Sequence, residues 1–298
     1  MKVLILGGSG MLGHKLCQVL TEGFDVCVTV RRPFDSYSQY GLFDRNHTVD
    51  HVSAEAFETV VDAIDTVRPT VVVNCIGVVK QVEAARDPVT SITVNSLLPQ
   101  RLAQLCVGKG IRLIHISTDC VFSGRRGDYL ESDAPDAEDL YGKTKVLGEV
   151  TGEGCLTLRT SLIGRELDTS HGLIEWFLSQ EGKTVGGYRK AIFSGLTTIA
   201  LSEIIARIMS HHPDLQGLYH VASEPISKFA LLSMVKDIYG LDIRIEPDEA
   251  VVCDRSLNGE RFRQAIGGSA IPGWPDMIRQ MYHDPTPYSQ LRRPYAKQ

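Results

Sequence analysis

The sequence lacks several features that would place the protein in a specialised class. No apolar run approaches the roughly 18 residues that a membrane-spanning helix needs, and the N-terminal apolar run is too short for a signal peptide. No long basic run is present, and the formal net charge of −5 gives no support for nucleic-acid binding. The seven cysteines form no CxxC pair and the nine histidines show no metal-ligand spacing, which argues against disulfides and a metal site. These absences predict a cytoplasmic globular protein that binds neither membrane nor nucleic acid.

What the sequence does contain is an alternation of strand-like and helix-like segments. Four nearly continuous apolar segments are typical of buried parallel strands, namely Val3–Leu6, Val26–Val30, Val71–Asn74 and Leu113–Ile116. Helices are predicted between and after them, at Met11–Leu20, Ala54–Val67, Asn95–Val107, Leu173–Ser179, Thr198–Met209 and Lys228–Tyr239. Short connections between these segments predict an α/β fold with a doubly wound parallel Rossmann sheet.

The alternation weakens after about Arg159, which suggests two regions. We expect a Rossmann domain over residues 1–160. A smaller C-terminal substrate-binding region is expected over residues 161–298, partly interleaved with the first. The tail Leu291–Gln298 shows no periodicity and is expected to be mobile or used in assembly.

A glycine-rich turn follows the first predicted strand directly. Gly7, Gly10 and Gly13 are spaced as GxxGxxG, a relative of the fingerprint of dinucleotide-binding folds. Gly7 permits a tight turn, Gly10 lets the backbone approach a pyrophosphate, and Gly13 lets the next helix pack close to the strand. The helix N-terminus, with Met11 and Leu12, supplies amide donors to the phosphates. The turn therefore predicts dinucleotide binding.

Two arginines follow the second predicted strand. An NAD enzyme usually carries an acidic residue at this place, where it accepts a hydrogen bond from the ribose 2′-hydroxyl. Arg31 and Arg32 can instead pair with a 2′-phosphate. We therefore expect NADPH as the cofactor, with NADH as the alternative. The other interpretation of these arginines is a solvated pair at the start of a loop.

A hydroxyl group and a Tyr–Lys pair then follow in the order that a ketoreductase needs. Thr118 lies at the C-terminal end of a predicted strand, where ligands bind in open α/β sheets. Tyr141 and Lys145 are four residues apart and share one face of a helix. The ammonium and an oxidised nicotinamide are expected to lower the pKa of the phenol. Tyr141 can then protonate a carbonyl oxygen that Thr118 also hydrogen-bonds, and Lys145 can also hold the nicotinamide ribose.

Longer motifs around these residues carry a resemblance to a known family. They are Ser117-Thr118-Asp119-Cys120-Val121-Phe122-Ser123-Gly124, Tyr129-Leu130-Glu131, Tyr141-Gly142-Lys143-Thr144-Lys145-Val146-Leu147-Gly148-Glu149, Leu158-Arg159-Thr160-Ser161 and Gly217-Leu218-Tyr219-His220-Val221. The chain resembles the extended short-chain dehydrogenase/reductase superfamily. Within it, the chain is most similar to the dTDP-4-dehydrorhamnose reductase branch, and the similarity spans nearly the whole sequence.

This resemblance implies roles for individual residues. Thr118, Tyr141 and Lys145 would form the catalytic set, and Asp119 would contact the substrate. Further contacts to the cofactor are implied for Ser117, Cys75, Ile76 and Gly77, in addition to Tyr141 and Lys145. No residue is implied as a metal ligand.

Two cationic residues depart from the family pattern and bear on the substrate. Lys80 and Arg255 stand where the family has other residues, and we expect both to face the anionic diphosphate of a nucleotide sugar. The alternatives are that Lys80 is a solvated loop residue and that Arg255 pairs with Asp254 or Glu260. These departures leave the identity of the sugar open.

The features together predict NADPH-dependent reduction of the 4-keto group of a nucleotide-linked 6-deoxy sugar, in deoxysugar or cell-surface polysaccharide biosynthesis. A 4,6-dehydratase would need a carboxylate after Asp119, where the chain has Cys120. An epimerase that binds NAD permanently is disfavoured by Arg31 and Arg32. A non-catalytic NADP-binding regulatory subunit that keeps the Tyr–Lys pair stays open as an alternative. The sequence also leaves open the nucleotide and whether the chain forms a homodimer.

Overall fold

The central feature of the fold is one parallel sheet. The computed structural model describes residues 1–80, 86–268 and 271–288. Gln81 and the predicted tail Leu291–Gln298 therefore lie outside the described residues. The sheet runs in the order β11-β6-β5-β4-β1-β2-β3 and every neighbouring pair is parallel. Its strands are β1 (Lys2–Leu6), β2 (Asp25–Thr29), β3 (Thr48–Val49), β4 (Val71–Asn74), β5 (Arg112–Thr118), β6 (Cys155–Thr160) and β11 (Gly217–His220). The strand order reverses between β1 and β4, which confirms the predicted doubly wound sheet.

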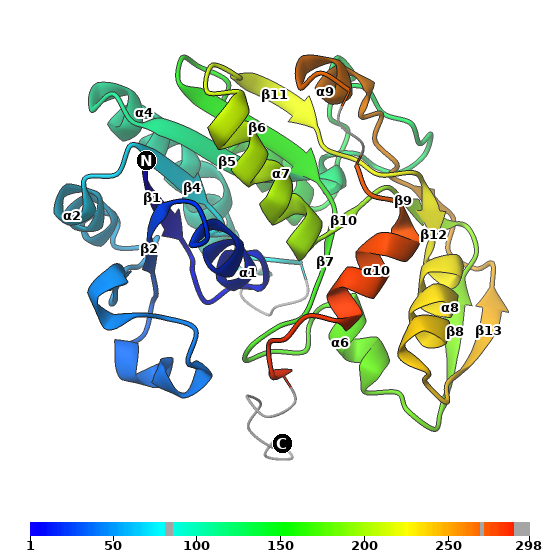
Figure 1. The fold of residues 1–298 in the computed structure, drawn as a ribbon. Coiled ribbons are helices and arrows are strands. Elements are labelled where there is room, and N and C mark those ends of the chain that lie inside the picture. Colours follow the sequence, from blue (N-terminus) through cyan, green and yellow to red (C-terminus); the bar gives the residue numbers. More distant parts are fainter. Residues whose placement is uncertain (81–85, 269–270, 289–298) are drawn as a thin grey trace.

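Helices cover both faces of this sheet (Figure 1). They are α1 (Met11–Leu20), α2 (Phe57–Val67), α3 (Pro88–Ile92), α4 (Leu98–Gly108), α5 (Leu140–Leu147) and α7 (Thr198–His211). Short helical turns are η1 (Phe34–Ser36), η2 (Ser38–Tyr40), η3 (Arg45–His47), the π-turn η5 (Thr93–Leu97) and η6 (Asp119–Val121). The alternation of buried side chains along β1 explains the two layers. Val3 and Ile5 join the apolar cluster with α1 and α7, while Leu4 and Leu6 join the cluster with α2 and α4.

Two of the predicted helices begin differently from the expectation. The helix predicted from Ala54 begins at Phe57, because Ser53 and Thr59 hydrogen-bond the preceding turn. The helix predicted over 95–107 is divided into a π-turn and α4. At this break the Asn95 amide side chain bonds both backbone groups of Val78, at 2.9 and 3.1 Å. The break therefore places a loop after β4 against the helix.

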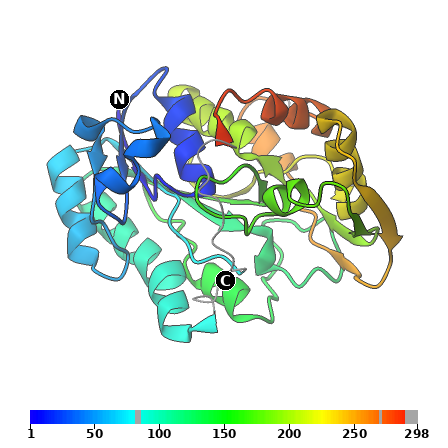
Figure 2. The same cartoon turned by 90° about the horizontal axis from the view of Figure 1, so that it is seen from below.

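The second region adds a smaller lobe at one side of the sheet, at the right in Figures 1 and 2. Its strands are β7 (Leu162–Ile163), β8 (Thr184–Tyr188), β9 (Ala191–Phe193), β10 (Leu196–Thr197), β12 (Ile226–Ser227), β13 (Arg244–Asp248) and β14 (Cys253–Asp254). Its helices are α6 (Leu173–Leu178), α8 (Lys228–Tyr239), α9 (Glu260–Ala265) and α10 (Trp274–Tyr282). In one of its small sheets, β9 lies between β12 and β14. That sheet brings together three segments that are far apart in sequence.

Parts of the second region also pack on the first sheet. Strand β11 pairs with β6, and α7 lies beside α1. Further along the chain, the ammonium of Lys15 on α1 lies 2.6 Å from the Asp284 carboxylate, and both side chains are buried. Two segments of the second region are therefore built into the first, while the boundary near residue 160 stays a prediction.

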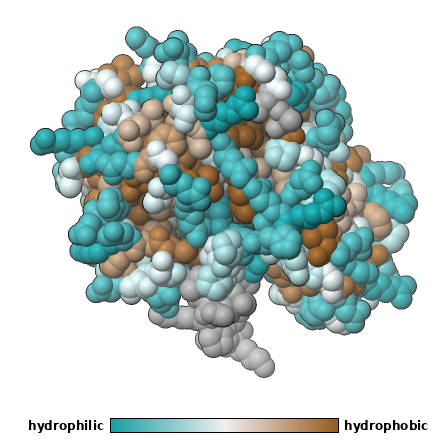
Figure 3. Space-filling model, viewed as in Figure 1, coloured by the Kyte–Doolittle hydropathy of each residue, from teal (hydrophilic) through white to brown (hydrophobic). Residues whose placement is uncertain are grey.

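None of the described helices is long and apolar enough to cross a membrane, and Figure 3 shows polar and apolar residues intermingled on one face.

Candidate active site

The glycine turn joins β1 to α1 through two close backbone approaches. Gly7 has φ of +83°, a conformation that side chains disfavour, and its amide donates to the Thr29 hydroxyl at 3.2 Å. A Cβ on Gly13 would lie 2.1 Å from the Gly7 carbonyl oxygen, so α1 could not pack so close to β1 with any other residue there. A Cβ on Gly10 would approach only that same oxygen, at 3.3 Å. The protein itself therefore leaves space beside Gly10, where a phosphate contact is predicted.

The loop after β4 packs directly on this turn. A Cβ on Gly7 would lie 3.1 Å from Cγ1 of Ile76, and the Ile76 amide donates to the Asn74 side chain at 3.1 Å. Cys75 and Gly77 flank Ile76 in the same loop. The structure thus places Cys75 and Ile76, two of the three residues predicted to contact the cofactor, against the glycine turn, and the third, Gly77, follows them in the loop.

The two arginines after β2 differ in their surroundings. Arg31 is exposed. Arg32 donates to the Asp168 carboxylate at 2.6 Å and to the Tyr37 hydroxyl at 3.4 Å, with its guanidinium 4.9 Å from the centre of the Tyr37 ring. Asp168 belongs to the loop between β7 and α6, and the neighbouring Leu167 is buried in a small cluster with Tyr37. An acidic residue therefore does reach this end of the sheet, from a distant part of the chain.

Thr118, Tyr141 and Lys145 meet at the carboxyl end of β5. Thr118 is the last residue of β5, and its hydroxyl interacts with the phenol of Tyr141 on α5. The contact depends on Gly142, because a Cβ there would lie 2.4 Å from the Cys120 carbonyl oxygen. The helix predicted from the Tyr–Lys spacing is present, with Lys145 one turn after Tyr141.

The local environment shifts the pKa values of this pair. Burial, with additional contributions from Cys120 and Asp119, raises the pKa of Tyr141 above its ordinary value of 10.0. The predicted lowering of this pKa needs an oxidised nicotinamide as well as the ammonium and stays a prediction; in the protein alone the Lys145 ammonium donates to the Ile116 carbonyl at 2.8 Å. Burial lowers the pKa of Lys145 from 10.5 to about 8. The chain therefore holds Tyr141 as a protonated phenol.

Ser117 makes a different contact from the one predicted. Its hydroxyl donates to the Glu149 carboxylate at 2.7 Å, and the same carboxylate is paired with the guanidinium of Arg159, also at 2.7 Å. All three groups lie behind the catalytic residues and are largely buried. The Ser117 hydroxyl thus links the end of β5 to the segment that follows α5, and its predicted cofactor contact stays a prediction.

The two cations predicted for the substrate are both held by the protein. Lys80 donates to the Asp139 carboxylate at 2.6 Å, and Asp139 also caps α5 by accepting from the Gly142 amide at 2.7 Å. Lys80 is therefore tethered above the start of the catalytic helix. Its side chain is half exposed, so a contact with an anionic ligand stays open to it.

Arg255 is tied to the loop after the catalytic strand. Its guanidinium donates to the carbonyl oxygens of Phe122 and Ser123, at 2.8 and 3.3 Å. The alternative pairings with Asp254 and Glu260 are wrong, since those carboxylates bond other residues. The anchoring to backbone oxygens positions Arg255 near Asp119 and Cys120, as their electrostatic interactions show.

One residue at the site was missed by sequence reasoning. Lys228, the first residue of α8, follows β12, and its ammonium lies 3.7 Å from the centre of the Phe193 ring on β9. It faces Asp119 and Cys120 and attracts the buried Asp119 carboxylate. Only the pairing of β12 with β9 brings Lys228 to this place. The available signal was a lysine at the first position of a predicted helix, where the helix dipole disfavours a cation.

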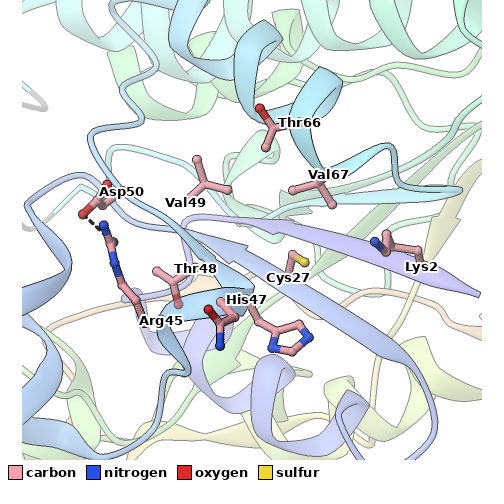
Figure 4. Close-up of a pocket in the computed structure, with 10 residues that line it drawn as sticks. Lys2, Cys27, Arg45, His47, Thr48, Val49, Asp50, Thr66 and Val67 are labelled. Atoms are coloured by element: carbon pink, nitrogen blue, oxygen red, sulfur yellow. Dashed lines mark hydrogen bonds and ion pairs between the residues drawn. The ribbon is translucent and has the colours of Figure 1, made fainter.

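A hollow at the opposite edge of the sheet is separate from these residues (Figure 4). It is lined by residues of β1 to β3, η3 and α2, and an ion pair between Arg45 and Asp50 at 2.9 Å lies at its border. None of the predicted site residues lines it. In the described part of the chain, no three His, Cys, Asp or Glu side chains are grouped to hold a metal ion.

Comparison with known proteins agrees with this arrangement. The parallel sheet, its glycine turn and the Tyr-x-x-x-Lys helix define a protein of the short-chain dehydrogenase/reductase class. Residues 1–250 match the model of the RmlD substrate binding domain family, and the chain belongs to this family.

Individual relatives cover most of the chain. The probable low-salt glycan biosynthesis reductase Agl14 of Haloferax volcanii is 31% identical over 235 residues, which is 75% of both chains. The dTDP-4-keto-6-deoxy-D-glucose reductase of Streptomyces niveus is 28% identical over 267 residues, 86% of this chain and 84% of that one. The crystal structure of dTDP-4-dehydrorhamnose reductase from Bacillus anthracis in complex with NADP superposes with a TM-score of 0.78 at 20% identity, covering 95% of this chain and 99% of that one. This last likeness shows the shared fold.

Proposed function

We propose that the chain is an NADPH-dependent reductase of the 4-keto group of a nucleotide-linked 6-deoxy sugar. The observation that carries the proposal is the meeting of the Thr118 and Tyr141 hydroxyls at the carboxyl end of β5, with Lys145 one helical turn away. The relative from Streptomyces niveus, named as a reductase of a dTDP-linked 4-keto-6-deoxy sugar, supports the substrate class. A cytosolic location is part of the same proposal.

The glycine turn supports a nicotinamide dinucleotide. No side chain caps the N-terminus of α1, so its first amide groups remain available to a pyrophosphate. The space beside Gly10 lets the phosphates approach the backbone. The solved structures with this fold include complexes with NADP and with NAD. We favour NADPH because Arg31 and Arg32 lie at the end of β2, where a 2′-phosphate would be bound.

The residues of the chain supply the proton that the reduction needs. When NADPH is bound, it supplies a hydride to the carbonyl carbon. The carbonyl oxygen then takes the phenol proton of Tyr141, so the C=O bond becomes C–H and O–H and the phenolate is left behind. With substrate bound, Thr118 turns its hydroxyl proton from Asp119 to the same oxygen and orients it. The raised pKa of Tyr141 keeps the phenol protonated until charge develops on the substrate oxygen.

Lys145 and Asp119 act on either side of this oxygen. Lys145, on the buried side, stabilises the phenolate that forms and is placed to bind the nicotinamide ribose. In the protein alone, Asp119 accepts a hydrogen bond from Thr118 at 3.0 Å, and this bond gives way when the Thr118 hydroxyl donates to the substrate oxygen. Lys80 and Arg255 both lie near Cys120, one residue after Asp119, where they could supply counter-charges to a nucleotide diphosphate.

The experiment is a turnover assay with purified protein, NADPH and a panel of 4-keto-6-deoxy nucleotide sugars. We expect NADPH to be oxidised in a 1:1 ratio with the alcohol formed, measured by absorbance and by mass spectrometry of the product. Tyr141→Phe is the matched control. A protein that binds NADPH but reduces none of these sugars would instead favour the regulatory-subunit alternative.

A further inference from the structure

A buried histidine lies one turn into α1, directly behind the glycine turn. The His14 side chain is fully buried. Its Nδ1 atom lies 2.8 Å from the Gly10 carbonyl oxygen, which also accepts from the His14 backbone amide at 3.1 Å. Gly10 has an extended backbone and no side chain that could cap the helix. The imidazole is therefore in direct contact with the residue that precedes α1.

This contact fixes the direction of one peptide group. In a trans peptide the C=O and the following N–H point in opposite directions, and the described residues contain no cis peptide bond. Because the Gly10 oxygen points toward His14, the Met11 N–H points the other way, out of the end of the helix. An N–H at this position has no acceptor inside the helix. It is one of the donors that a pyrophosphate at this turn would use.

The tautomer of His14 decides whether the contact is attractive. Burial lowers the pKa of His14 to about 4, so the ring is neutral and carries one proton. With that proton on Nδ1, the ring donates to the Gly10 carbonyl. With the proton on Nε2, two acceptors would lie 2.8 Å apart with no proton between them. The geometry therefore requires the form that is protonated at Nδ1.

The Tyr288 hydroxyl supplies the partner that this form needs. It lies 3.0 Å from Nε2 of His14 and 3.1 Å from the Asp284 carboxylate, and it has one proton to donate. The carboxylate already receives the Lys15 ammonium at 2.6 Å. In the part of the chain that the structure describes, Nε2 of His14 has no other donor. The hydroxyl proton therefore belongs to His14, which leaves Nε2 as the acceptor and Nδ1 as the donor.

The Tyr288 ring is held independently of its hydroxyl. It packs edge-on to His14 with the ring centres 5.8 Å apart, and the guanidinium of Arg165 lies 4.6 Å from the centre of the Tyr288 ring. The ring also belongs to the small apolar cluster that contains Tyr37. Removing the hydroxyl alone should therefore leave residues 284–288 packed against α1.

We propose that Tyr288 and His14 are positioning residues for the cofactor. The Tyr288 hydroxyl fixes the His14 tautomer, and His14 holds the peptide between Gly10 and Met11 with its N–H toward the pyrophosphate. The two hydrogen bonds to the Gly10 oxygen also polarise this peptide, which makes its N–H a better donor. The inference rests on the nicotinamide dinucleotide of the proposed function but not on the sugar. Because NADPH and NADH share the pyrophosphate, both should depend on Tyr288 equally.

The first test is cofactor binding to Tyr288→Phe, measured by fluorescence titration. We expect the Kd values of NADPH and NADH to rise by the same factor, about 2- to 10-fold, as for the loss of one hydrogen bond between uncharged groups. In turnover, KM for NADPH should rise in parallel, while kcat at saturating NADPH stays unchanged. Thr286→Val is the matched control. It removes a hydroxyl of the same segment that bonds Lys15 and Gln18 on α1, at 3.2 and 3.0 Å, and should leave both Kd values unchanged.

The second test observes the tautomer directly. In protein labelled with nitrogen-15 histidine, the NMR signals of His14 are assigned by their loss in His14→Asn. The parent should show a neutral ring that is protonated at Nδ1. Tyr288→Phe should show a mixture of the two tautomers, because Nε2 has lost its donor.

His14→Asn also separates the donor from the tautomer. The asparagine amide nitrogen takes the place of Nδ1 and donates to Gly10 without the help of a second residue. The Kd values of this variant should be close to those of the parent. Adding Tyr288→Phe to it should have no further effect, because the hydroxyl no longer controls the donor.

Several results would overturn the inference while leaving the reductase intact. They are unchanged Kd values in Tyr288→Phe, a rise for NADPH alone, an equal rise in Thr286→Val, or a parental His14 that is protonated at Nε2 or at both nitrogens. A parent protein that binds neither NADPH nor NADH would overturn the proposed function and this inference together.

Discussion

The two ends of the proposed cofactor and substrate site handle charge in different ways. At the arginine end, defined by Arg31, Arg32 and Asp168, the ion pair is solvated, with side-chain exposures of 53% for Arg32 and 35% for Asp168. At the catalytic end, Lys145 and Asp119 are 5% and 6% exposed. The same kinds of charged groups are therefore screened by water at one end and nearly dry at the other.

The difference teaches where electrostatics is strong in this protein. In water, two charges interact weakly and salt screens them further, so the arginine end can adjust cofactor preference only modestly. In the buried end, removing hydration moves the pKa of Lys145 to about 8 and raises that of Asp119. We therefore expect large effects on chemistry from changes at the buried end and small, salt-dependent effects at the exposed end.

The largest effect is expected from Tyr141→Phe. This change removes the hydroxyl that protonates the substrate and keeps the ring, so kcat should fall by about 10²- to 10⁴-fold. NADPH affinity, measured by fluorescence titration, should change little. Thr144→Val, which removes a hydroxyl that bonds the Tyr141 backbone carbonyl on the same helix, serves as a matched control. Turnover by Tyr141→Phe at the parental rate would remove Tyr141 from the mechanism.

The next prediction concerns the pH dependence set by Lys145. Its ammonium is the active form, and a pKa of about 8 means that this form is lost as pH rises through 8. In the free enzyme, kcat/KM should therefore fall by about tenfold per pH unit above that value, while Tyr141, with its raised pKa, stays protonated.

Stability should change with the opposite sign over the same range. Between pH 8 and 10.5 the unfolded chain keeps the Lys145 proton while the folded chain has lost it, so this group makes folding more favourable as pH rises. In Lys145→Met, both the fall of kcat/KM above pH 8 and this rise in stability should disappear. The stability is measured by denaturant unfolding. If kcat/KM of Lys145→Met still falls in the same way above pH 8, a group other than Lys145 causes that fall.

A smaller effect is expected when both arginines are removed. Replacing Arg31 and Arg32 by alanine should weaken NADPH binding by about 5- to 30-fold, because exposed ion pairs are worth roughly 1 kcal/mol or less each. NADH binding should change by less than twofold. Equal losses for the two cofactors would show that the arginines do not distinguish a 2′-phosphate.

The smallest effect is expected from Asp168→Asn. Asp168 holds Arg32 at 2.6 Å and places a negative charge where a 2′-phosphate would bind. Removing that charge should tighten NADPH binding by about 2- to 5-fold at low salt, with little change at high salt because the interaction is screened. Weaker NADPH binding in this variant would mean that Asp168 orients Arg32 productively, and the comparison of the two ends would need revision.

Much of the fold followed from local patterns. The apolar segments predicted the strands β1, β2, β4 and β5, and the doubly wound sheet they imply is confirmed. The helix boundaries were less exact where side chains bond the backbone of a neighbouring turn, as Ser53 does before α2. In the protein alone the pKa of Tyr141 is raised by burial, which depends on how η6 and α5 pack, and the predicted lowering by Lys145 together with an oxidised nicotinamide stays a prediction.

By itself, the sequence determined the features that act over a few residues. The spacing of Gly7, Gly10 and Gly13 specifies a turn, and the four-residue spacing of Tyr141 and Lys145 specifies one helix face, since both follow from backbone geometry. Only the tertiary structure decided which distant charges join them. Asp168 reaches Arg32 through a loop of the second region, and Lys228 reaches Asp119 because β12 and β14 pair with β9. These contacts join residues that are more than 100 positions apart in the sequence, and no local pattern encodes the loop packing and strand pairing that bring them together.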